Sequence, residues 1–345
     1  MYDDYFIFDN VVHMFDNRTS NKLGEPGRKM IDSIWGAAKL YSKGPYIAHP
    51  DFGEGHIEPA EAHRILFEES DTDMAVAQTV PLMGWFKEGF SPARANHALA
   101  SAYPDRVVFC GGVDPLYHGS RGALDEMRRQ KEEWNAISFK FYQSQLNGSA
   151  WRADDRHVAY PLWEQALKLG ITSVQFHKGF PFGRQLLEHQ RPNDLEQASI
   201  DFPELTFIIH HLGMPFVDDT INIASRHENI WVALSAWINI YPIQPRVAMD
   251  MLGKALMFVG ADRLLYGSEA FVWPSLQPYI KLFADMQMPE DLQDGYGYPE
   301  ITREMKRKMF GENQARLFGI DVEKKKLELR AKKAAAGTAA AAAAY

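Results

Sequence analysis

Short apolar runs alternate along the chain with longer segments in which apolar residues recur at helical spacing. Each short run is rich in Val, Ile, Phe or Leu and has little polar alternation, a pattern typical of parallel strands buried on both faces. The predicted strands are Tyr5–Asp9, Met74–Val80, Val107–Val113, Ala136–Tyr142, Thr172–His177, Thr206–His211, Ile230–Ser235 and Leu264–Ser268.

Helical patterns lie between these strands. Pro59–Glu69, for example, places Ala60, Leu66 and Phe67 at helical spacing. Strands that alternate with helices in this way predict an α/β fold, a (β/α)8 TIM barrel. An open doubly wound sheet has the same local pattern, but no G-x-G-x-x-G turn follows the first strand. The other predicted helices are Arg121–Trp134, Ala159–Leu169, Asp218–Glu228, Arg246–Leu256, Leu276–Asp285 and Ile301–Met309.

The domain organisation follows from two segments that do not fit this repeat. Residues 1–321 form a single predicted barrel domain, and residues 14–58 are a long loop insertion after the first strand. Such a long loop is usually functional, and its aromatic residues favour an ordered lid. Residues 322–345 are basic and then rich in alanine, so we expect a helical or disordered extension. Docking of this extension on a neighbouring subunit would give a homodimer.

Composition excludes several classes of protein. The 345 residues carry 37 basic and 45 acidic side chains, a net charge of −8, and no basic block precedes the last segment, which argues against nucleic acid as a partner. The single cysteine, Cys110, excludes a disulfide framework and a cysteine-only zinc site. The acidic N-terminus is unlike a signal peptide, and no apolar run reaches the ~18 residues of a membrane span. We therefore expect a cytoplasmic protein.

Candidate chemistry gathers where the predicted strands end. In (β/α)8 enzymes the active site lies at the C-terminal ends of the strands. Imidazole nitrogens and carboxylates that meet there suit a Zn²⁺ or Mn²⁺ ion with an open coordination position. A metal site is therefore the leading interpretation. Four of the twelve histidines and two carboxylates fall at or just after strand ends, namely His13, His177, His210, His211, Asp9 and Glu269.

The order of these residues resembles the amidohydrolase superfamily, in particular its amidohydrolase-2 branch, which includes aminocarboxymuconate-semialdehyde and resorcylate decarboxylases. The likeness runs from Asp9 to Asp321 and includes the softer segments Gly112–Pro115, Tyr160–Ala166 and Glu312–Gly319. It implies the barrel fold and one divalent metal ion. The motifs that carry it are Asp9…His13, His177, His210-His211-Leu212-Gly213 and Gly267-Ser268-Glu269.

The resemblance also implies roles for individual residues. The metal ligands it indicates are His13, His177 and Glu269, and His211 matches an acid/base or substrate-polarising histidine. Two departures matter: Val11 stands where the family has a histidine or glutamate, and Glu269 replaces an aspartate. The ion could still be held, with Asp9 or the loop residues His49 or His56 in support. Alternatively, the site works without a metal, by acid/base chemistry of His211 and Glu269.

Further candidates have an ordinary structural interpretation beside the functional one. Asp9 is a catalytic candidate, or it orients a histidine. Lys140 could pair with a substrate carboxylate, or with a neighbouring acid. Arg18 could anchor a carboxylate, or be a solvated loop charge. Trp237 could line an aromatic substrate pocket, or pack in the core.

Three functions follow from this set of residues. The first is non-oxidative decarboxylation of an aromatic or unsaturated carboxylic acid by a metal-dependent enzyme. The second is hydrolysis of an ester, lactone, amide or carbon–carbon bond by water that a metal or a carboxylate activates. The third is a binding protein whose site has decayed at Val11. The expected ligand is a small carboxylic acid.

Overall fold

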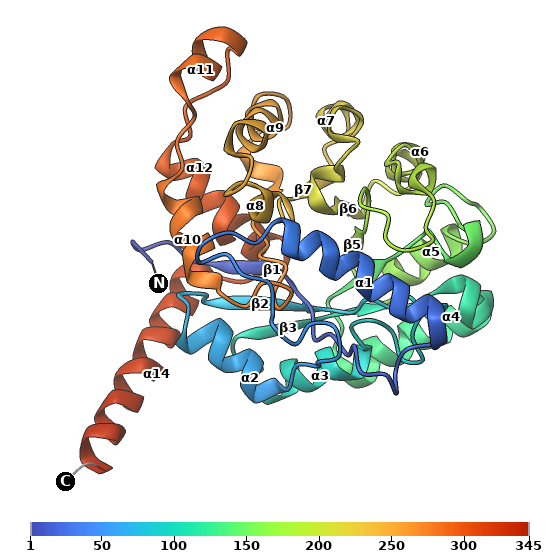
Figure 1. Ribbon diagram of the computed structural model, residues 1–345, viewed down its shortest axis with the longest axis horizontal. Coiled ribbons are helices and arrows are strands. Elements are labelled where there is room, and N and C mark those ends of the chain that lie inside the picture. Colours follow the sequence, from blue (N-terminus) through green and yellow to red (C-terminus); the bar gives the residue numbers. More distant parts are fainter. Residues whose placement is uncertain (1, 344–345) are drawn as a thin grey trace.

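The computed structural model describes residues 2–343, and from residue 333 onward only the course of the backbone is described. Eight parallel strands form one sheet in sequence order, and Figure 1 shows the helices placed around it. The predicted (β/α)8 barrel is confirmed. The strands are β1 (Phe8–Val12), β2 (Met74–Gln78), β3 (Val107–Gly112), β4 (Ser138–Phe141), β5 (Ser173–Phe176), β6 (Thr206–Ile209), β7 (Ile230–Ala233) and β8 (Leu264–Leu265).

The first and last strands close the barrel through backbone contacts. The Asn10 N–H donates to the Tyr266 carbonyl oxygen at 3.0 Å, and Val12 forms a parallel bridge with Ala270. The register between β1 and β2 shifts between Asp9 and Val12. Because the bridge to Ala270 lies beyond β8, the residues that follow the first and eighth strands are held close together.

The first strand lies later in the chain than the sequence predicts. The prediction was Tyr5–Asp9, whereas β1 spans Phe8–Val12. Tyr5 is buried against Phe310, with ring centroids 5.1 Å apart, and Phe6 is buried in a cluster with Ala315. The apolar character of this segment therefore reflects packing under the C-terminal helices and not strand pairing. Asp9 consequently lies inside β1, and His13 follows the strand directly.

The helices cover the outside of the barrel in the predicted order, with additional ones. Figure 1 shows α14 extending away from the barrel. The α-helices are α1 (Gly24–Leu40), α2 (Pro59–His63), α3 (Ala93–Ala102), α4 (Pro115–Trp134), α5 (Tyr160–Lys168), α6 (Asp194–Asp201), α7 (Val217–Arg226), α8 (Trp237–Ile240), α9 (Pro245–Phe258), α10 (Leu276–Asp285), α11 (Glu290–Tyr296), α12 (Arg303–Arg307), α13 (Asn313–Leu317) and α14 (Val322–Ala343).

The insertion after β1 is not an irregular loop throughout, because it contains the 17-residue helix α1. Met30, Ile31 and Ala38 are buried on one side of this helix, at the spacing of a single helical face. Gly24, Pro26 and Gly27 at the start of α1, together with the glycines and prolines that follow the helix, hid this periodicity in the sequence. In the view of Figure 1, α1 lies across the strands.

The start of α14 is attached to the bottom of the barrel. Lys326 Nζ donates to the Asp4 carbonyl oxygen at 3.1 Å, and Arg330 pairs with the Asp4 carboxylate at 2.8 Å. Val322 and Leu329 pack against the cluster around Phe8. Within residues 2–343, no helix is both long and apolar enough to cross a membrane.

Candidate active site

A cavity of about 820 Å³, including its open mouth, lies at the C-terminal ends of the strands. Its polar end is formed by three histidines and one glutamate, and almost all of the remaining lining is apolar. No lysine or arginine of the described chain is among the lining residues. These are His13, Met30, Ile34, Ala37, Ala38, Tyr41, Val80, Leu82, Phe90, Tyr142, His177, Phe180, Phe182, Gln185, His211, Ala236, Ile240, Glu269, Val272 and Trp273.

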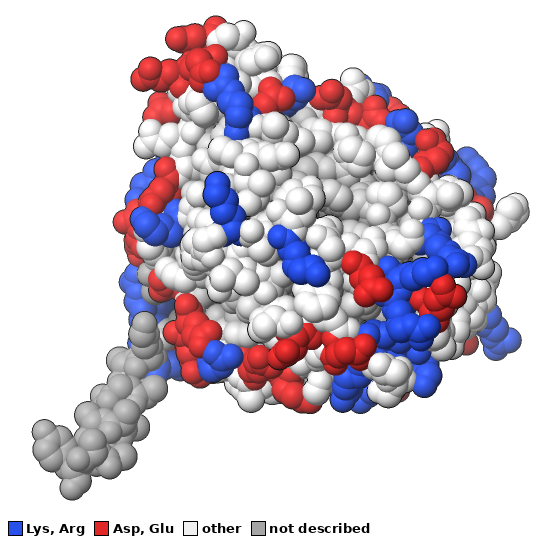
Figure 2. Space-filling view, viewed as in Figure 1, with Lys and Arg blue, Asp and Glu red and all other residues white. Residues whose placement is uncertain are grey.

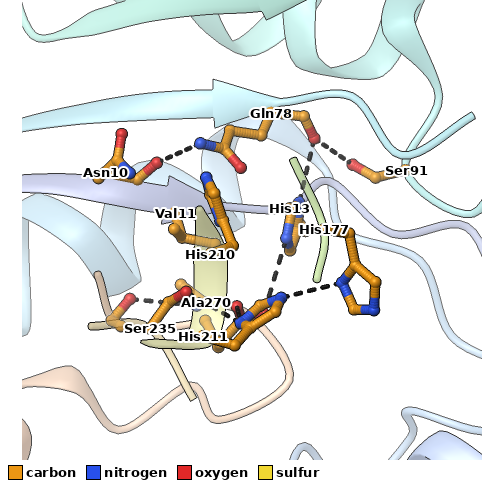
Figure 3. Close-up of polar contacts among 12 residues, drawn as sticks. Asn10, Val11, His13, Gln78, Ser91, His177, His210, His211, Ser235 and Ala270 are labelled. Atoms are coloured by element: carbon orange, nitrogen blue, oxygen red, sulfur yellow. Dashed lines mark hydrogen bonds and ion pairs between the residues drawn. The ribbon is translucent and has the colours of Figure 1, made fainter. Parts of the chain in front are cut away.

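At the polar end, His177 and His211 form a hydrogen-bonded pair, and a backbone carbonyl determines which nitrogen of His177 carries the proton. His177 Nε2 lies 3.1 Å from the Phe180 carbonyl oxygen, which can only accept, so this nitrogen carries the proton. His177 Nδ1 lies 2.9 Å from His211 Nε2 (Figure 3). Burial and the charges of His211 and Lys140 lower the pKa of His177 well below its usual range, so its ring is neutral. His177 Nδ1 must then accept a hydrogen bond from the N–H at His211 Nε2.

The same chain of contacts continues through Glu269 to the first strand. His211 Nδ1 is 3.2 Å from Glu269 Oε1, and His13 Nε2 is 3.6 Å from Glu269 Oε2. His13 Nδ1 lies 3.1 Å from the Gln78 carbonyl oxygen, which again only accepts. This series of contacts therefore ends at a backbone carbonyl on both sides, that of Phe180 and that of Gln78. The Glu269 carboxylate lies between nitrogens of His211 and His13.

Beneath these groups a second layer of polar side chains fills the barrel. His210 Nε2 lies 2.7 Å from Gln175 Oε1, which also accepts from Gln78 Nε2 at 2.8 Å. Ser235 Oγ lies 3.1 Å from His211 Nδ1. His210 is fully buried and does not line the cavity. It therefore supports the neighbouring layer, whereas His211 faces the cavity.

Three of the strand ends adopt a backbone conformation that L-residues rarely take. His211 has φ 62°, Ala236 has φ 58° and Glu269 has φ 60°. Each such residue costs roughly 1–3 kcal/mol and persists where the surroundings fix it. These residues follow β6, β7 and β8, so the strain is concentrated at the polar end of the cavity. Sites of this kind are typical of functional centres.

Electrostatics keep the carboxylate charged and the first-strand histidine neutral. Burial alone would raise the pKa of Glu269, but His211, His13 and Lys140 hold it well below its usual range. Burial lowers the pKa of His13 to about 4, although Glu269 opposes this. Near neutral pH, Glu269 is therefore a carboxylate and His13 offers a bare Nε2 toward it.

Lys140 is a buried cation below this layer. Its side chain is completely inaccessible, and Nζ has no hydrogen-bond partner among the described residues. Nζ lies 5.6 Å from the centre of the Tyr142 ring, which in turn stacks on His177 with 4.7 Å between centroids. Burial lowers the pKa of Lys140 to about 7, although the charge of Glu269 raises it. Lys140 therefore acts on the site through its charge and through Tyr142.

The donors that the sequence indicates for a metal ion do not converge on one point. Both ring nitrogens of His177 make hydrogen bonds, to His211 and to the Phe180 carbonyl. A Zn²⁺ or Mn²⁺ site needs at least three protein ligands with lone pairs directed to a common centre about 2 Å away. Within residues 2–343, no three His, Cys, Asp or Glu side chains are placed to hold a metal ion. The residues present therefore do not fit the implied metal ion.

The structure separates the remaining candidates from the cavity. Asp9 Oδ1 accepts the backbone N–H groups of Val11 at 3.0 Å and Ser268 at 2.9 Å, and burial raises the pKa of Asp9 to about 6. Asp9 thus ties β1 to the end of β8. Arg18 pairs with Asp16 at 2.6 Å and borders a different cavity. Neither Asp9 nor Arg18 lines the cavity described above.

Trp237 and the two loop histidines also lie elsewhere. Trp237 is fully buried, and its indole N–H donates to the Ala248 carbonyl oxygen at 2.7 Å. His49 Nε2 lies 3.8 Å from Glu61, and His56 Nε2 lies 2.7 Å from Glu58. Trp237 therefore packs in the core, and the two histidines pair with carboxylates outside the cavity.

The sequence pattern did not indicate several of the residues that line the cavity. Met30, Ile34 and Tyr41 come from the insertion, so α1 and the residue after it form one wall of the cavity. Phe180 and Phe182 follow β5 and line another side. The sequence does place Phe180 and Phe182 within five residues of His177, which could have indicated that they line the same site. Nothing in the sequence indicates that α1 packs against the cavity.

Comparison with known proteins places the chain in a family. The sequence model of the amidohydrolase family matches residues 54–320. The match begins after β1, so the first-strand segment with Val11 and His13 lies outside it. No curated protein sequence matches the chain.

Solved structures share the fold at low sequence identity. An uncharacterized TIM-barrel protein from Bordetella bronchiseptica is 19% identical, with a TM-score of 0.65 over 91% of this chain and 98% of that one. A dihydroxybenzoic acid decarboxylase from Polaromonas with bound manganese is 12% identical, with a TM-score of 0.62 over 91% and 97% of the two chains. A probable 2-pyrone-4,6-dicarboxylic acid hydrolase from Acinetobacter baumannii is 14% identical, with a TM-score of 0.56 over 91% and 99%. With its family match and its (β/α)8 barrel, this chain belongs to the amidohydrolase family.

Proposed function

We propose that this chain is a hydrolase that cleaves an ester or lactone of an apolar, uncharged small molecule, with Glu269 as the base. One observation carries the proposal: a charged carboxylate lies between two imidazoles at the end of an otherwise apolar cavity. A base near a bound water needs hydrogen-bond reach and an ionised form at working pH. The depressed pKa of Glu269 supplies the ionised form.

The cavity favours a substrate without a negative charge. Glu269 is anionic, and none of the described lining residues is a lysine or arginine that could neutralise a second carboxylate. The surface around α1 has the same character: Figure 2 shows few charged side chains at the centre of this face and many at its margin. Leu40, the last residue of α1, and Ile47, which follows it in the chain, are exposed apolar residues. An apolar, neutral substrate is therefore the best match.

The reaction then follows from the positions of the protons. Glu269 takes a proton from water, and the resulting hydroxide adds to the carbonyl carbon of the substrate. His211, which lines the cavity, stabilises the oxyanion that forms through an imidazole N–H group. The carbon–oxygen bond to the leaving group breaks, and the proton held by Glu269 passes to the departing oxygen. The products are an acid and an alcohol, and Glu269 is again a carboxylate.

Decarboxylation, the reaction that the sequence ranks first, is the second candidate because the Polaromonas decarboxylase has the same fold. In it, an acid of the site would protonate the substrate carbon, and the bond to the carboxylate would break to release CO₂. The acid substrate that this requires would have to enter beside the Glu269 carboxylate, which is why we place it second.

The test is turnover of aryl esters, lactones and phenolic acids in ¹⁸O-labelled water. Hydrolysis places ¹⁸O in the product acid, and Glu269→Gln and His211→Ala should each lower kcat by about 10²–10⁴-fold. The control is Glu304→Gln, which should leave the rate unchanged because Glu304 is exposed and does not line the cavity. Release of CO₂ without label would replace hydrolysis by decarboxylation. Full activity of Glu269→Gln would refute the proposed base.

A further inference from the structure

Val11 lies on β1, two residues before His13, and its side chain has no atom that can bind a metal ion. Its side chain is fully buried and points to the end of β8. A Cβ atom on Gly267 would lie only 2.8 Å from Val11 Cγ2 and 3.1 Å from the Ser235 Cβ. The isopropyl group of Val11 therefore fills the space beside Gly267 and Ser235, the residues that follow β8 and β7. Gly267 is two residues before Glu269, and the atoms of the isopropyl group cannot bind an ion.

Most of the other potential donors already make hydrogen bonds. His177 uses both ring nitrogens, and His211 donates to His177 through Nε2 while Nδ1 faces Ser235 and Glu269. Asp9 Oδ1 accepts two backbone N–H groups. Within the described part of the chain, Asp9 Oδ2 and His210 Nδ1 have no hydrogen-bond partner, but neither residue lines the cavity. Among the described histidines and carboxylates that line it, His13 Nε2 and the Glu269 carboxylate remain, 3.6 Å apart, which is a distance that two ligands of one ion can have. Figure 3 shows Val11 on the same barrel end as these histidines.

We infer that Val11 is the residue that keeps a divalent metal ion out of this site, and that a histidine in its place would complete a metal site with His13 and Glu269. Val11 lies within the register shift of β1, His13 follows the strand directly, and Figure 3 shows both residues at the same end of the barrel. Because Gly267 has no side chain, the Val11 side chain occupies the space that a Cβ there would need, and a histidine at position 11 would enter the same space. Three protein ligands with an open position are the set that a catalytic zinc site uses.

The experiment measures metal content and not turnover, so its outcome is independent of the proposed hydrolysis. Wild type, Val11→His and the apolar control Val11→Leu are purified without chelator, dialysed against excess Zn²⁺ or Mn²⁺, and analysed for bound metal. We expect about one equivalent in Val11→His, as a single-ion site requires, and only traces in wild type and Val11→Leu. Adding His13→Ala to Val11→His should remove the ion. Ion binding should also raise the Tm of Val11→His selectively.

Two outcomes overturn the inference. If wild type holds about one equivalent that His13→Ala removes, Val11 does not exclude the ion. If Val11→His folds and binds no more metal than Val11→Leu, a histidine there does not complete the site. Val11→Asn, with a smaller side chain that also carries a donor, is the second variant if Val11→His does not fold. Whether or not Val11→His folds, the metal content of the wild type tests whether the natural site excludes the ion.

Discussion

Lys140 shows how one side chain controls the charge of the site. The group is fully buried, and burial lowers its pKa from 10.5 to about 7. Between these two values the unfolded chain binds more protons than the folded protein, so stability rises with pH. The cost of the buried ammonium is therefore present in full below pH about 7 and is relieved as pH rises toward 10.5.

Replacement of Lys140 by methionine should accordingly stabilise the protein most at low pH. We expect a gain on the order of a few kcal/mol below pH about 7, which shrinks steadily at higher pH because the lysine is then neutral in the folded state. Denaturant unfolding of both proteins over this range measures it. Lys168→Met, at a site where 70% of the side chain is exposed, is the control and should show no such trend. A gain from Lys140→Met that does not change with pH would contradict the explanation.

At the scale of elements, the loop after β5 holds two aromatic residues of the cavity in place. Lys178 Nζ pairs with Asp194 at 2.6 Å in an almost completely buried contact, and also donates to the Arg191 carbonyl oxygen at 2.9 Å. Gly179 follows with φ 80°, and the Phe180 N–H donates to the Met214 carbonyl oxygen at 2.9 Å. These contacts join the loop after β5 to α6 and to the loop after β6.

Gly179→Ala should destabilise the protein strongly. An added Cβ would lie 1.7 Å from the Met214 carbonyl oxygen, and the backbone conformation is itself unfavourable for alanine. We expect a loss of at least about 2 kcal/mol in the free energy of unfolding. Gly170→Ala is the matched control, because Gly170 has φ 70° but open space around its Cα, and should cost only about 1 kcal/mol. Equal losses at the two positions would show that the close approach of the loops does not matter.

In the whole molecule, helices surround the barrel and α14 extends away from it (Figure 1). The first turns of α14 contact the barrel through Lys326, Arg330 and Leu329, and the helix then extends away from it (Figure 1). An isolated helix gains little stability from propensity alone, and most helices in proteins are stabilised by packing. We therefore propose that α14 packs against a second copy of the chain.

Removal of the residues after Asp321 tests this proposal. The full chain should scatter light as a dimer and the truncated chain as a monomer. Arg330→Ala is a milder variant that removes the ion pair with Asp4, and it should leave the dimer intact while α14 still packs. Two chains of the same oligomeric state, with and without α14, would contradict the proposal.

The linear pattern of the chain is enough to predict the barrel and four of the residues that meet at the cavity. Buried parallel strands are continuous apolar runs, so β2 to β8 could be located from composition along the chain, and His13, His177, His211 and Glu269 follow strands. The bounds of β1 were displaced because Tyr5 and Phe6 are apolar for another reason, packing under the C-terminal helices.

Only the tertiary structure decided what these residues do to one another. Which nitrogen of His177 is occupied depends on the Phe180 carbonyl and His211, contacts made by different strands. The wall formed by α1 depends on where a helix from the insertion packs across the barrel. Distances between residues far apart in sequence are set by strand register and loop geometry, and a linear pattern holds no record of either. The sequence thus identified Val11 as a departure, and the fold showed that its side chain fills the space between the ends of β7 and β8.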